Sequence, residues 1–152
     1  MILWECKHFD ELNTGDLYAI LQLRIEVFVV EQNCPFQDCD DKDQQSFHVT
    51  AWQQNKLIAY TRVMPAGLAY KEPSIGRVVT SPLVRGKNIG RQLMERSINK
   101  VYELYGTTPI MIGAQLYLKK FYHSLGFAQS SDIYLEDGIE HIKMLHIPHK
   151  IQ

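Results

Sequence analysis

The sequence predicts a single α/β (α+β) domain, built on a mixed, mostly antiparallel twisted sheet of about seven strands with helices on both faces. A length of 152 residues fits one domain, residues 1–152, that buries a sizeable core. Period-two alternation, the pattern of half-buried strands, occurs in residues 2–8, 47–52 and 57–64. A helical stretch separates two short apolar runs, 75–80 and 110–114, which predicts a right-handed crossover and one parallel strand pair.

The remaining elements follow from caps, stops and periodicity. Asn13 or Thr14 caps the first helix, and Asp16 is favourable in its first turn. Gly106 ends the second helix. Its inward face is predicted to carry Ile89, Leu93, Met94, Ile98, Val101, Leu104 and Tyr105. The expected order is strand 2–8, helix 16–29, strands 47–52, 57–64 and 75–80, a helix to about residue 105, strand 110–114, helix 116–125, and strands 128–135 and 139–146.

Composition excludes several classes of function. A net charge of -1 argues against a general nucleic-acid binder, which needs a basic face. No apolar run approaches the length that spans a membrane, and the first residues lack the features of a signal peptide. Three cysteines cannot all pair within one chain, which favours reduced thiols and a cytoplasmic location. The spacing of Cys34 and Cys39 fits no zinc pattern, so we expect no metal.

A loop rich in glycine and cations connects the strand at 75–80 to the second helix. Pro82 stops the strand because proline has no N–H for the ladder. The first N–H groups of a helix have no partners within it and can hold an anion. Arg85, Lys87 and Arg91 add positive charge at the positive end of the helix dipole, which an anion would relieve. The pattern predicts a pyrophosphate cradle; the alternative is an ordinary cationic surface turn.

This loop resembles the cofactor loop of the GNAT family of N-acetyltransferases, written R/Q-x-x-G-x-G/A. Arg85 and Gly90 match that pattern. Asn88 stands where the family usually has glycine, and asparagine is among the few residues that tolerate a left-handed backbone, so the loop can still form.

Two further segments carry the resemblance. Residues 122–127, which begin with Tyr122 and end in Gly-Phe, look like the family's Tyr-x-x-x-Gly-Phe motif. Residues 24–35, with the spaced acids of 38–43 and His48, are similar to the ElaA-like branch of the family. The order of elements is also that of the family, so the resemblance covers nearly the whole chain.

The resemblance implies an acyltransferase (N-acetyltransferase, EC 2.3.1.-) that moves an acetyl group from acetyl-CoA to a primary amine of a small molecule or peptide. The backbone of Val78, Val79 and Thr80 would pair with the pantetheine arm, and an N–H near Val79 would stabilise the oxyanion. The fourth and fifth strands would splay to admit the thioester. Pyrophosphate would lie on the loop and the first helical turn, formed by Arg85, Gly86, Lys87, Asn88, Ile89, Gly90 and Arg91.

Tyr122 would be the general acid that protonates the departing thiolate; the alternative is a core tyrosine whose hydroxyl bonds to backbone. Many family members use a glutamate on the fourth strand as base, and residues 74–79 contain none. Glu31 and His48 are the candidates, with a water-mediated path as a further option. His48 could equally be a surface or satisfied strand histidine.

The acceptor pocket is predicted from the first helix. Arg24 lies on its apolar stripe and, with Phe28, would form a wall of the pocket. Alternatively, Arg24 forms a partly buried pair with Glu31. The acidic segment 38–43 is either a solvated loop or a funnel that attracts a cationic substrate.

Three other functions remain open. One is a synthase like those that make acyl-homoserine lactones, because Arg24, Phe28 and the spaced acids fit that pattern loosely. Another is a non-catalytic CoA-binding sensor or partner module. A third is a phosphate-binding module for another nucleotide. The acceptor and the oligomeric state are not specified, although these folds often form homodimers through their C-terminal strands.

Overall fold

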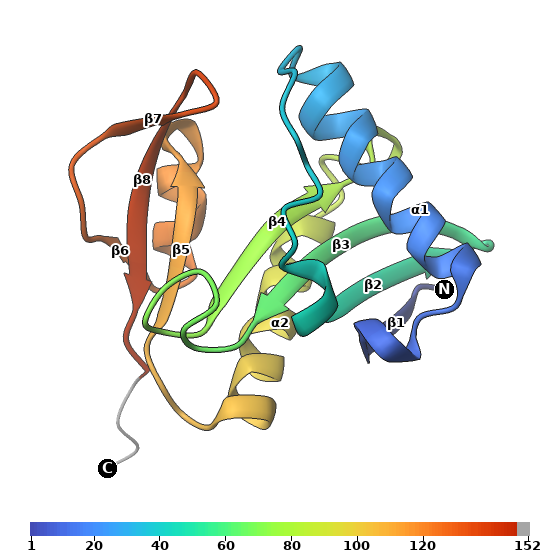
Figure 1. Ribbon diagram of the computed structural model, residues 1–152, viewed down its shortest axis with the longest axis horizontal. Helices are drawn as coiled ribbons and strands as arrows, with labels where there is room; N and C mark the ends of the chain where they lie inside the picture. The colour runs from blue at the N-terminus through green and yellow to red at the C-terminus, as the bar shows by residue number, and fades with distance from the viewer. Residues whose placement is uncertain (149–152) are drawn as a thin grey trace.

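The computed structural model describes residues 1–148, which form one mixed sheet of eight strands with helices on both faces (Figure 1). The predicted fold class is confirmed, with one more strand than expected. The helices are α1 (Thr14–Arg24), α2 (Ile89–Tyr105) and α3 (Lys119–Ser124). The strands are β1 (Leu3–His8), β2 (Phe47–Gln53), β3 (Lys56–Met64), β4 (Ser74–Thr80), β5 (Ile110–Gln115), β6 (Phe127–Gln129), β7 (Tyr134–Glu136) and β8 (Ile139–His146).

The extra strand comes from the segment expected to be one strand at 128–135. Two short strands, β6 and β7, replace it, and each pairs with β8. Within residues 1–148 the strand order is β1-β2-β3-β4-β5-β8-β6, with β7 also on β8. The predicted antiparallel meander of β2, β3 and β4 and the parallel pairing of β4 with β5 are both confirmed.

The central pair of strands diverges soon after it begins. In the described residues β4 pairs with β5 at Ser74 and Met111 alone, and the Met111 N–H donates to the Pro73 carbonyl at 3.0 Å. Beyond this point the two strands separate into the open angle in the middle of Figure 1. The expected splaying of the fourth and fifth strands is therefore confirmed, and it divides the sheet into two halves.

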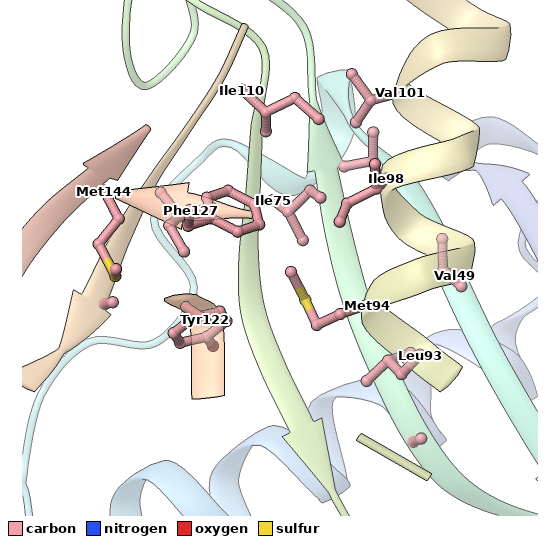
Figure 2. Close-up of a cluster of buried hydrophobic side chains, with 14 of the residues drawn as sticks. Val49, Ile75, Leu93, Met94, Ile98, Val101, Ile110, Tyr122, Phe127 and Met144 are labelled. Atoms are coloured by element: carbon pink, nitrogen blue, oxygen red, sulfur yellow. The ribbon is translucent and has the colours of Figure 1, made fainter. Parts of the chain in front are cut away.

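Helix α2 covers one face of the sheet. Figure 2 shows Leu93, Met94, Ile98 and Val101 on this helix, directed toward the strands. The inward position of Leu104 was wrong, since that side chain is 37% exposed. Ser97 is buried instead, and its hydroxyl bonds both to the Leu93 carbonyl and to Thr61. Hydrophobic periodicity cannot reveal such a satisfied polar residue.

Helix α1 covers the other face of the β1–β4 half, where its Ile20 and Leu23 pack against Tyr60 and Val79. The expected helix 16–29 is wrong in its second half. The α-helix ends at Arg24, and a π-helical segment, η2 (Ile25–Glu31), follows. π-Helical turns are rare and are often found at functional sites. Within residues 1–148, no helix is long and apolar enough to cross a membrane.

Candidate active site

A cleft of about 850 Å³ lies where β4 and β5 separate. Segment η2, helix α3 and the β7–β8 hairpin also contribute to its walls. Eight residues expected at the site line it: Phe28, Glu31, Val78, Val79, Thr80, Arg85, Gly90 and Tyr122. The structure thus brings the predicted cofactor strand, part of the predicted loop and the predicted acid to one cavity.

Strand β4 presents unpaired backbone to this cleft. Its register with β3 slips, so that Thr61 faces both Arg77 and Val78, and Arg77 has a φ of 50°. This is a β-bulge, which bends the strand. On the β5 side the strand has no ladder partner after Ser74 among residues 1–148. Its free N–H and C=O groups can pair with an extended ligand, as in strand addition.

The loop before α2 has the conformation that an anion site requires. Asn88, the N-cap residue, has φ 64° and ψ 16°, so it adopts the expected left-handed conformation. Its side chain does not cap the helix. The first-turn N–H groups of Ile89, Gly90 and Arg91 therefore have no partner within the helix and remain available to an anion.

Two of the three cationic side chains of this loop, Arg85 and Arg91, are already engaged. Arg85 forms a two-pronged ion pair with Glu31 of η2, in which Nη2 and Oε2 are 2.6 Å apart. The Arg91 Nη1 donates to the Ser124 hydroxyl at 2.9 Å, and its Nε lies 3.2 Å from Glu95. Hydrogen bonding from Arg85 lowers the pKa of Glu31, which makes that carboxylate a weak base.

Tyr122 combines a buried ring with a hydroxyl that makes no hydrogen bond to the described residues. The ring packs edge-on against Phe121 and Phe127, and it belongs to the buried cluster drawn in Figure 2. Within residues 1–148 the hydroxyl makes no hydrogen bond, and its oxygen is not sealed from solvent. Since Tyr122 lines the cleft, the hydroxyl faces it. The alternative of a hydroxyl bonded to backbone is therefore not observed. Burial raises the pKa of Tyr122, which keeps the phenol protonated.

Arg24 does not reach the cleft. Its side chain is 0% exposed; Nε donates to Asp38 at 2.7 Å and Nη1 to Asp43 at 2.8 Å. Its place in the acceptor wall is therefore wrong, and so is the pairing with Glu31, which η2 directs toward Arg85. The alternative of a buried ion pair is confirmed for Arg24, but its partners are Asp38 and Asp43 instead of Glu31.

Three of the four aspartates in the acidic segment 38–43 are paired with arginines, and only Asp41 among the four is exposed, so the segment is neither a fully solvated loop nor a funnel. Asp40 binds Arg62 through both carboxylate oxygens, at 2.7 and 2.9 Å, and lies 3.4 Å from Arg77. Asp43 also accepts a hydrogen bond from Arg62, at 2.9 Å. Burial alone would raise the pKa of Asp40, but the two arginines outweigh it and lower the pKa to about 2.

His48 also lies outside the cleft. Its Nδ1 is 2.6 Å from the Tyr60 hydroxyl, and its Nε2 is 2.9 Å from the Asp43 carbonyl. Burial lowers its pKa. The expected role as base is therefore wrong, because the ring does not reach the cleft. The alternative is confirmed: His48 is a strand histidine whose two ring nitrogens both have hydrogen-bond partners.

Sequence reasoning missed the far end of the cleft. Gln32 and Gln115 exchange amide hydrogen bonds at 3.3 and 3.5 Å, and the Cys34 thiol donates to the Asp137 carbonyl at 3.2 Å. These contacts join residues 83 and 103 positions apart, so no local pattern indicates them. His141 also lines this end. His141 is two positions after Ile139, which also lines the cleft, and this period-two spacing indicates that both side chains lie on the same face of the strand.

Comparison with known proteins agrees with this architecture. The acetyltransferase (GNAT) domain family matches residues 20–147. The chain is 42% identical to protein ElaA of Escherichia coli (strain K12) over 95% of both chains. It is similar to the crystal structure of an acyl-CoA N-acyltransferase from Pseudomonas aeruginosa, with a TM-score of 0.92, 42% identity and coverage of 96% and 99%. A CoA-dependent acyl-homoserine lactone synthase has a TM-score of 0.76 at 14% identity, with coverage of 95% and 82%; this shows the fold alone.

Proposed function

The chain belongs to the GNAT acetyltransferase family, and from this premise we propose that it transfers an acetyl group from acetyl-CoA to a primary amine of a small molecule or peptide. The amine would attack the thioester carbonyl directly. The observation that carries the proposal is one cleft that combines the unpaired edge of β4, the first turn of α2 and the Tyr122 hydroxyl.

The cofactor half of the cleft supports CoA as the donor. The free backbone of Val78 to Thr80 offers alternating donors and acceptors to the amide groups of pantetheine. The uncapped first turn of α2 supports a pyrophosphate, because the helix dipole and its N–H groups both favour an anion. Arg85 adds a cation at the same wall.

The reaction would use two hydrogen-bond donors at the cleft: a backbone N–H of β4 and the Tyr122 hydroxyl. A backbone N–H of β4 near Val79 would stabilise the oxyanion that forms when the amine attacks. As the C–S bond breaks, Tyr122 would donate its proton to the sulfur. The raised pKa of this phenol and its free hydroxyl both suit a donor that stays protonated until the thiolate forms.

The far end of the cleft supports a cationic acceptor. Glu136 and Asp137, both exposed, line it from the β7–β8 hairpin. Neither carboxylate has an arginine or lysine partner among residues 1–148, unlike Glu31 and Asp40. An ammonium group therefore meets uncompensated negative charge on approach.

Thermal unfolding with and without acetyl-CoA tests the donor, with ATP as the control. Ligand at a hundredfold over Kd adds about 2.7 kcal/mol of stability. Transfer is then followed as free thiol released with putrescine, tyramine and a short peptide with a free amino terminus. We expect a shift with acetyl-CoA alone and thiol release with at least one amine. No shift would reject CoA as the donor; a shift without transfer would favour a non-catalytic CoA-binding module.

A further inference from the structure

The proposed reaction needs a proton acceptor, and the residues considered so far do not supply one. Glu31 is tied to Arg85, Asp40 is held by Arg62, and His48 lies outside the cleft. Strand β4 has no carboxylate between Ser74 and Thr80. A free amine is mostly protonated near neutral pH, so a group that removes its proton is required before attack.

His141 on β8 has the geometry that this role requires. It lines the cleft and is 7% exposed. Its Nδ1 lies 2.8 Å from the Ile139 carbonyl. A carbonyl oxygen can only accept, so Nδ1 carries the hydrogen and Nε2 of the neutral ring is left with a free lone pair.

Residues of β7 and β5 surround His141 and orient its ring. The Glu136 Oε2 lies 3.5 Å from Nε2, and the Tyr134 ring stacks on the imidazole at 5.9 Å between centroids with an interplanar angle of 27°. Both residues come from β7, whereas Gln115 faces His141 from β5. Among these neighbours Glu136 is the charged group, and its carboxylate can accept a hydrogen bond from Nε2 once that nitrogen has taken up a proton.

The sheet register places His141 on the β5–β8 wall of the cleft, which faces β4. Ser74 on β4 is paired with Met111 on β5, and the strands are parallel. Four residues further along each strand are Val78 and Gln115, and Gln115 is paired with His141. His141 and Gln115 share the face that lines the cleft. The imidazole thus lies across the splayed opening from the β4 backbone expected to bind the thioester.

We propose that His141 is the catalytic base of this site, held by Ile139 and assisted by Glu136. The proposal rests on the proposed acetyl transfer. An ammonium acceptor gives one proton to Nε2 of His141, and the neutral amine forms the N–C bond. The C–S bond breaks with its electron pair on sulfur, which takes the Tyr122 proton. The second amine proton returns to the Tyr122 oxygen through water, and the imidazolium releases its proton to solvent.

His141→Gln in the full chain tests this assignment, with His123→Gln, an exposed histidine outside the cleft lining, as the matched control. The acceptor is whichever of putrescine, tyramine or the free-amino-terminal peptide the wild type uses. We expect kcat/KM at pH 7 to fall about a hundredfold or more in His141→Gln, as is usual for a general base. The acetyl-CoA Kd should stay within about threefold, because His141 lies outside the predicted cofactor strand and loop.

The pH profile separates a base from a structural histidine. Wild-type kcat/KM should fall at acidic pH as the imidazole becomes charged, and the His141→Gln profile should lack this limb. In His141→Ala, added imidazole should restore part of the rate. A loss below threefold, or an acidic limb that persists in His141→Gln, overturns the assignment while leaving acetyl transfer intact. A wild type inert with every amine overturns the proposed function and this inference together.

Discussion

Arg85 and Glu31 form a two-pronged ion pair that joins the loop before α2 to the π-helical segment after α1. Both side chains line the cleft and both are about 40% exposed. The cation expected to meet the CoA pyrophosphate is therefore already occupied by a carboxylate. Phosphate oxygens and the Glu31 carboxylate would compete for the same guanidinium.

Glu31→Gln is expected to tighten acetyl-CoA binding, because the pyrophosphate no longer displaces a carboxylate. An exposed ion pair contributes about 1 kcal/mol or less, so the gain should not exceed about fivefold. Isothermal titration calorimetry measures it, with Glu103→Gln at the far end of α2 as the control for net charge. Arg85→Gln should weaken binding about tenfold. Weaker binding in Glu31→Gln would instead show that the pair positions Arg85.

Tyr122→Phe is expected to lower kcat about a hundredfold and to leave the acetyl-CoA Kd within a few-fold. The ring keeps its contacts with Phe121 and Phe127, while the proton for the thiolate is lost. Thiol release and calorimetry on the same preparation measure the two quantities. Tyr117→Phe, which removes another hydroxyl at the cleft, is the control. Unchanged kcat in Tyr122→Phe would rule out the acid role.

Asn88→Gly and Asn88→Val should behave oppositely. Glycine adopts the left-handed conformation of Asn88 freely, whereas a β-branched residue does so at a cost of about 1–2 kcal/mol or more. We expect Asn88→Gly to keep both stability and acetyl-CoA affinity, and Asn88→Val to lose both. Urea unfolding and calorimetry measure these changes. Equal affinity in the two variants would mean that this conformation is not needed for binding.

Acid should destabilise the protein through Asp40. Its pKa is about 2 in the fold against 3.8 for the free side chain, so its ionised form stabilises the fold above pH 4 and this contribution is lost as the pH falls toward 2. A difference of this size corresponds to about 2 kcal/mol. Urea unfolding between pH 5 and 2 should be less pH-dependent in Asp40→Asn. Parallel curves for the two proteins would contradict this.

The features predicted correctly from sequence are those that short segments determine. The meander of β2 to β4 and the parallel β4–β5 pair follow from alternation and chain order. Each depends on neighbours in the chain or on the handedness of a crossover. The opening between β4 and β5 and the left-handed conformation of Asn88 were instead expected from the family resemblance.

The errors concern contacts between distant segments. Arg24 meets Asp38 and Asp43, which are 14 and 19 positions away, because the chain folds back after η2. A run of acids cannot show that three arginines from α1, β3 and β4 neutralise it. His48 alternates correctly along its strand, yet the side of the sheet that it faces depends on the packing of the whole domain.

Within the part of the chain that the structure describes, β4 and β5 pair only at Ser74 and Met111, so the two half-sheets are separate hydrogen-bond ladders. Amide hydrogens of β4 that face the cleft should exchange with solvent far sooner than those that β4 shares with β3. A bound pantetheine arm would slow the exchange of these cleft-facing amides. Deuterium uptake along β4 would therefore report how much of the cleft is occupied, without any turnover. In such a complex the cosubstrate would complete the backbone ladder, and its departure would leave the strand edge open again.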